Sequence, residues 1–121
     1  MYLPFTTDVQ GKKIIVYGAG TFGQQLVKRF KIDRLAEIVS WVDDDYWEYR
    51  RCCMDVDPIS RVCIQDYDYV LIAILAPISI RRIMKKLIDY GVSENRIITI
   101  SATNEQINHA YETFLSNSII E

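Results

Sequence analysis

Three of the chain's five glycines lie close together in the segment GAGTFG, at Gly18, Gly20 and Gly23. The segment follows an apolar run, KKIIVY, and precedes an amphipathic pattern, which is the context in which a G-x-G-x-x-G sequence binds the diphosphate of a nucleotide. In such a turn the first glycine permits the tight bend, the second lets a phosphate approach the backbone, and the third lets the helix pack against the sheet. The spacing therefore predicts a phosphate-binding turn.

A helix beginning at Thr21 would add to this anion site. Its first N–H groups lack partners within the helix and carry about half a positive charge, so no lysine or arginine is needed. The hydroxyl of Thr21 could contribute as well. The alternative is that the glycines only close a turn, which would account for Gly18 and Gly23 but not readily for Gly20.

Acidic residues follow the second predicted strand, in AEIVSWVDDD. Asp43 lies 20 residues after Gly23, where a carboxylate accepts hydrogen bonds from ribose hydroxyls. Asp44 and Asp45 continue the run, so the assignment could shift by one position. An acid here repels a 2′-phosphate, which favours NAD over NADP.

Two arginines bear on the preference for NAD over NADP. Arg50 and Arg51 lie downstream of the acidic run and would weaken it if their loop folds back. The same segment holds Tyr46, Trp47 and Tyr49. These aromatics could stack on a base or sugar, contact another protein, or pack over the edge of the sheet.

The remaining pattern alternates strands with helices, which predicts a Rossmann-like α/β fold of three layers around a mainly parallel five-stranded sheet. We expect the strand order 3-2-1-4-5, with a weak third strand in PISRVCI. Pro77 is suited to the first turn of a helix, and Gly91 to its C-terminal end. A last helix is predicted after Thr103. The predicted strands are KKIIVYG, AEIVSWVDDD, PISRVCI, DYVLIAIL and RIITI.

Length and composition limit the classes of function. The chain of 121 residues fits one domain, with residues 1–11 as an N-terminal tail or added edge segment. Its net charge of −2 gives no electrostatic reason to expect nucleic-acid binding. Three cysteines and one histidine show no zinc-binding spacing, so no metal is expected. The longest apolar run is shorter than the roughly 20 residues that span a bilayer, and we expect a cytoplasmic protein without direct membrane insertion.

Catalytic residues are harder to find than binding residues. No tyrosine has a lysine four positions later, and His109 is the only histidine. Asp66 and Asp68 are interpreted as acids at a strand end. About five strands leave no second domain to hold a substrate, so the sequence predicts a binding unit that works with another domain or subunit, including a second copy of itself as a homodimer.

The span from Lys12 to about Ser101 resembles small Rossmann-like domains of bacterial surface-polysaccharide and nucleotide-sugar enzymes. Examples are the N-terminal domain of PglD-type sugar acetyltransferases and the nucleotide-binding domain near the start of polysaccharide-biosynthesis epimerase/dehydratases. The matching segments are KKIIVYGAGTFGQQLV, VSWVDDD, DYDYVLIAI and LIDYGVSENRIITI. One departure is that the chain has no glycine from 24 to 90, so the loop that would hold the base and sugar is expected to be reshaped.

The resemblance implies a nucleotide-binding domain that holds NAD or a UDP-sugar and acts in nucleotide-sugar metabolism or polysaccharide assembly. No acetyltransferase repeats are present, so acetyl transfer is not implied. Two alternatives remain open: a module that senses NAD or NADH through an oligomer interface, and a methyltransferase that uses S-adenosylmethionine. The residues expected to bind the cofactor are Gly18, Ala19, Gly20, Thr21, Phe22, Gly23, Asp43, Asp44, Ala73 and Leu75.

Overall fold

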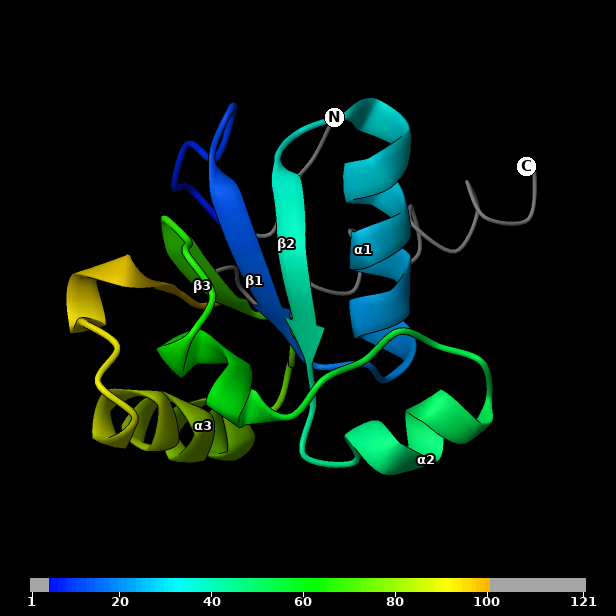
Figure 1. The fold of residues 1–121 in the computed structure, drawn as a ribbon. Helices are drawn as coiled ribbons and strands as arrows, with labels where there is room; N and C mark the ends of the chain where they lie inside the picture. Colours follow the sequence, from blue (N-terminus) through cyan, green and yellow to red (C-terminus); the bar gives the residue numbers. More distant parts are fainter. Residues whose placement is uncertain (1–4, 101–121) are drawn as a thin grey trace.

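The structure is a computed structural model that describes residues 5–100 of the chain. The predicted last helix and His109 lie outside these residues. Within the described part, four parallel strands form one sheet between helices (Figure 1). The elements run in the order β1 (Lys13–Tyr17), α1 (Thr21–Asp33), β2 (Glu37–Val42), α2 (Tyr46–Arg51), η1 (Ile59–Cys63), β3 (Tyr69–Ile72), α3 (Pro77–Asp89), η2 (Glu94–Arg96) and β4 (Ile97–Ile98).

The strand order is β2-β1-β3-β4, and every neighbouring pair is parallel. β1 and β3 lie in the middle, so their carboxyl ends come side by side, with Tyr17 opposite Ile72. Both central strands are built from apolar, mostly β-branched residues, as is usual for strands covered on both faces. The α/β class and the relative order of these four strands are as predicted from the sequence.

The prediction of a third strand in PISRVCI is wrong. PISRVCI forms the 3₁₀ helix η1, and the only strand-like pairing nearby is an isolated parallel bridge between Val42 and Asp57. A strand would place Ile59 and Arg61 on the same face, because its side chains repeat every two residues. A repeat of three residues instead places Ile59 with Val62, and both are buried. Burial of this apolar pair accounts for the helical turn.

Three layers result, because the helices cover both faces of the sheet (Figure 1). On one face, α1 buries Leu26, Val27 and Phe30 against β1 and β3. On the other face, η1 and α3 pack Val62, Ile83 and other apolar side chains against the same strands. The sheet is thus the shared wall of two hydrophobic cores.

Helix α3 begins and ends as the sequence predicts. Pro77 lies at the start of the helix, where its missing N–H costs no hydrogen bond. Gly91 follows the last turn with φ of +96°. Its N–H donates to Ile88 O, and the N–H of Val92 donates to Leu87 O, which is the Schellman arrangement. The left-handed backbone angle explains why glycine occupies this position.

The N-terminal segment is part of the fold in its described portion. Phe5 and Val9 are buried in the same core as α1, and the rings of Phe5 and Phe30 lie 6.3 Å apart between centroids. Residues 5–9 therefore extend that core beyond the sheet and its helices.

Candidate functional site

The turn between β1 and α1 is held by close backbone contacts. Gly18 has φ of +121°, and a Cβ built there would lie 2.9 Å from Ala73 O. A Cβ on Gly23 would lie only 2.1 Å from Gly18 O. Real Cβ atoms do not approach backbone so closely, so both glycines are required by the fold itself: Gly18 by the turn and Gly23 by the packing of α1 against it.

Gly20 differs from its two neighbours. Its φ of −73° is one that any residue adopts, and a Cβ built there would meet nothing within 4 Å. The residue is exposed and is the N-cap of α1, with no side-chain cap hydrogen bond. Neither backbone strain nor internal packing therefore requires a glycine at this position.

The carboxylate of Asp43 faces the glycine turn. Its Oδ2 accepts a hydrogen bond of 2.8 Å from Ala19 N, and its Oδ1 accepts one of 2.8 Å from Asp45 N. A carboxylate has about four acceptor positions, so each oxygen retains capacity for a further donor. The sequence left open which acid of the run faces the turn, and the structure identifies Asp43.

Asp44, in the loop after β2, forms hydrogen bonds with Tyr17 and Lys86 and does not face the glycine turn. Its Oδ1 accepts hydrogen bonds from Tyr17 Oη at 2.6 Å and from Lys86 Nζ at 2.7 Å. Burial alone would raise the pKa of the Asp44 carboxyl, but the hydrogen bonds from Lys86 and Tyr17 outweigh it and lower that pKa. Burial and the bond to Asp44 together raise the pKa of the Tyr17 hydroxyl. This cluster links β1, the loop after β2 and α3, and its acid is already paired.

Two side chains outside the motif fix the carbonyls of the turn. Trp41 Nε1 donates to Gly18 O at 2.7 Å, and Gln24 Nε2 donates to Ala19 O at 2.9 Å. Neither residue was predicted from the sequence, and neither were Tyr17 and Lys86. Trp41 is in β2, two residues before Asp43, and a strand pattern continued to Asp43 places the two side chains on the same side. No local pattern connects Lys86 with Asp44.

The other residues predicted to bind the cofactor lie around the same turn but differ in how far their side chains are exposed. Thr21 is exposed at the first position of α1, whereas the side chain of Phe22 is 7% exposed and packs in the core. A ligand at the turn could therefore meet only the backbone of Phe22. Ala73 is buried, with its N–H donating to Tyr17 O at 2.8 Å, and Leu75 packs at the edge of the same core as Phe22.

The aromatic and basic segment forms helix α2, which the sequence did not resolve. Trp47 is 63% exposed, while Tyr46 and Tyr49 are half-buried. Burial, followed by the charges of Asp43 and Asp45, raises the pKa of Tyr49. Arg51 pairs with Glu48 at 3.5 Å, and Arg50 pairs with Asp57 at 2.7 Å. Both arginines thus have acidic partners other than the acids at the turn.

Neither a metal cluster nor a membrane-spanning helix is found in residues 5–100. No group of three or more His, Cys, Asp or Glu side chains in this part could hold a metal ion. The three cysteines are free and exposed. No helix of the described residues is both long enough and apolar enough to cross a membrane.

Comparison with known proteins assigns the chain to a family. No curated protein and no solved structure matches it significantly. A family model described as C2185-like, N-terminal, matches residues 10–98. This match covers the glycine turn, the acids after β2 and all four strands. The chain therefore belongs to the C2185-like N-terminal domain family, as a small parallel α/β domain.

Proposed function

We propose that the chain binds a nucleotide, NAD or a UDP-sugar, at the turn between β1 and α1. In this proposal the diphosphate lies over Gly20 and the first turn of α1, and Asp43 accepts hydrogen bonds from ribose hydroxyls. The chain would then be the nucleotide-binding part of an enzyme of nucleotide-sugar metabolism or surface-polysaccharide synthesis, working in the cytoplasm with a second domain or subunit. The resemblance to PglD-type and epimerase/dehydratase domains supports this assignment.

The observation that carries the proposal is the contrast among the three glycines. Packing or backbone strain requires Gly18 and Gly23, whereas nothing within the described residues requires Gly20. A glycine at an unstrained, exposed N-cap is explained if another molecule must come close to that backbone. The position also lies at the positive end of a helix of 13 residues, which favours an anion such as a phosphate.

The surroundings of Asp43 favour NAD over NADP. A 2′-phosphate near this carboxylate would be repelled unless a cation compensated the charge. The two nearby candidates, Arg50 and Arg51, pair with Asp57 and Glu48, and among the described residues neither forms an ion pair with Asp43. A ribose with two free hydroxyls fits this arrangement better than a phosphorylated one.

Ligand-induced stabilisation tests the proposal. Thermal unfolding of the chain should be measured with NAD, NADP, UDP-glucose and S-adenosylmethionine. A ligand present at 100 times its Kd adds about 2.7 kcal/mol to the free energy of unfolding. We expect NAD or UDP-glucose to raise the Tm, and Gly20→Val to fold normally but lose that rise, because its side chain occupies the space proposed for the phosphates.

Two further variants make the experiment specific. Gln10→Val introduces valine at an exposed position before β1, whereas the glycine turn follows the other end of that strand, and this variant should respond like the parent. Asp43→Asn retains an acceptor for Ala19 N–H but loses the charge, so it should bind NAD more weakly. If no nucleotide raises the Tm, or if Gly20→Val responds fully, the proposal is wrong.

A further inference from the structure

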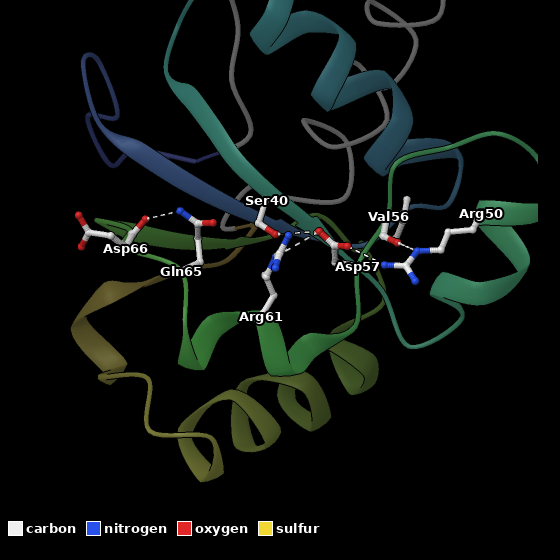
Figure 2. Close-up of polar contacts among 7 residues, drawn as sticks. All are labelled: Ser40, Arg50, Val56, Asp57, Arg61, Gln65 and Asp66. Carbon is white, nitrogen blue, oxygen red and sulfur yellow. Dashed lines mark hydrogen bonds and ion pairs between the residues drawn. The ribbon is translucent and has the colours of Figure 1, made fainter.

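A second polar cluster lies on the outer side of β2, away from the glycine turn. Asp57 sits at its centre, with Arg50 of α2 and Arg61 of η1 approaching its carboxylate from different sides (Figure 2). Arg50 Nη2 donates to Asp57 Oδ1 at 2.7 Å, and Arg61 Nε lies 3.4 Å from Asp57 Oδ2. Ser40 Oγ also donates to Oδ2, at 3.5 Å. One acid is thus shared by two guanidinium groups.

The centre of the cluster is held rigidly by backbone hydrogen bonds. The N–H of Asp57 donates to Trp41 O at 2.8 Å, and Asp57 O accepts from Asp43 N at 3.1 Å. Arg50 is fixed a second time, because its Nε donates to Val56 O at 2.9 Å. The side chain of Asp57 is only 17% exposed, whereas those of Arg50 and Arg61 are 40% and 43% exposed. The acid is covered, and the two cations reach the surface.

The hydrogen-bonding capacity of the two arginines exceeds what this acid can use. A guanidinium has five N–H donors. Arg50 Nη1 takes no part in the two bonds above, and the ion pair with Asp57 is the only polar contact of the Arg61 side chain among the described residues. Two positive charges against one negative charge leave a net charge of +1. The surplus donors and the surplus charge lie together.

Arg50 and Arg61 both border a cavity of about 290 Å³ between α2 and η1. Its polar lining comes from the two arginines, Ser60 and the largely covered Asp57, and its less polar lining from Tyr46, Pro58 and Ile64. The guanidinium of Arg50 lies 5.0 Å from the centre of the Tyr46 ring, a contact that restricts the orientation of both side chains. A cavity of this size accommodates a phosphate group with a small organic substituent.

We infer that the cavity between α2 and η1 binds the phosphate group of a small phosphomonoester, through Arg50 and Arg61, at a site separate from the glycine turn. Guanidinium groups are the side chains best suited to phosphate oxygens. Two forks approaching from different elements match a tetrahedral phosphate better than a planar carboxylate. The apolar surface of Ile64 and the ring of Tyr46 would contact the organic part of the ligand. This inference does not depend on nucleotide binding at Gly20.

NMR titration of the ¹⁵N-labelled chain without nucleotide tests the inference. Inorganic phosphate, phenyl phosphate and acetate are added in turn, with the ionic strength held constant by sodium chloride. We expect shifts in the resonances of the cavity residues with both phosphates, tighter binding of phenyl phosphate, and weak or no binding of acetate. Arg61→Gln should raise the Kd of phenyl phosphate at least about tenfold, as expected for loss of hydrogen bonds from a charged donor.

The matched control is Arg51→Gln, which removes the same charge one residue from Arg50. Arg51 pairs with Glu48 on the exposed side of α2, so this variant should bind phenyl phosphate like the parent. The side chain of Arg61 makes no hydrogen bond to the backbone of the described residues, and retention of the parent's circular dichroism spectrum checks that the variant folds. The inference is overturned if no cavity resonance responds to phosphate, if acetate binds as tightly as phenyl phosphate, or if Arg51→Gln weakens binding as much as Arg61→Gln.

Discussion

The two candidate sites lie on either side of β2 and use different chemistry. At the glycine turn, backbone N–H groups and the end of α1 would meet the ligand, and the absence of a side chain at Gly20 is the main feature. In the cavity between α2 and η1, charged side chains would meet it, and the backbone serves to hold Asp57. A site formed by backbone groups depends on close packing of the chain around it. A site formed by charged side chains depends on individual charges, each of which one substitution can remove. Substitutions in the two regions should therefore differ in cost.

The largest loss in the free energy of unfolding is expected for a substitution within the glycine turn. Gly23→Ala places a Cβ 2.1 Å from Gly18 O, so α1 must move away from the sheet. Backbone atoms on both sides cannot yield as a flexible side chain would, and we expect a loss of about 3 kcal/mol or more in the free energy of unfolding. Urea denaturation followed by circular dichroism measures it.

Gly20→Ala is the control for that substitution. It adds the same methyl group three residues earlier, where nothing lies within 4 Å of it, and should cost less than about 1 kcal/mol. Equal losses at the two positions would contradict the distinction between glycines required by packing and the glycine left for a ligand.

The turn was predictable because its determinants are local. Three glycines, a β-branched run before them and an amphipathic run after them lie within one stretch of sequence, as do Pro77 and Gly91 at the two ends of α3. The cluster around Asp57 was not predictable. Arg50, Asp57 and Arg61 have no recognisable spacing, and Arg61 lies on η1, which forms where a strand was expected. The contact of Asp43 with the turn, in contrast, could be expected from its position directly after β2, although only the structure excluded a shift to Asp44.

An intermediate loss in the free energy of unfolding is expected in the polar cluster around Asp57. Asp57→Asn removes the charge shared by Arg50 and Arg61 while keeping the size of the side chain, and should lower the free energy of unfolding by about 1–2 kcal/mol. The estimate is modest because both arginines reach solvent, which weakens ion pairs. Urea denaturation in low and high salt measures the loss, which should shrink in high salt.

Glu48→Gln provides the comparison for Asp57→Asn. It breaks the pair with Arg51, whose two side chains are 69% and 68% exposed, and such pairs contribute less than about 1 kcal/mol. A cost for Glu48→Gln as large as that for Asp57→Asn would mean that burial of the Asp57 carboxylate adds nothing.

The smallest loss of stability is expected at Asp44, whose bonds with Lys86 and Tyr17 join the loop after β2 to α3 and β1. A carboxyl whose pKa is lowered by folding stabilises the protein above its unfolded-state pKa of about 4, and this contribution is lost as the pH falls through the lower folded-state value.

The Asp44 and Lys86 side chains are 38% and 39% exposed. Because solvent screens the pair, Lys86→Met should cost less than about 1 kcal/mol at pH 7. The difference from the parent should narrow as the pH falls below about 4, because the unfolded chain then binds a proton that the paired carboxylate of the folded parent does not, and the electrostatic part is lost once the pH is below the lowered folded-state pKa. Lys85→Met alters the exposed neighbour of Lys86 and should show no such dependence on pH. If both variants gave parallel curves of unfolding free energy from pH 7 to pH 3, the contact with Asp44 would have no electrostatic part in holding the loop after β2, and the orientation of Asp43 toward the turn would depend on its own bonds to Ala19 and Asp45.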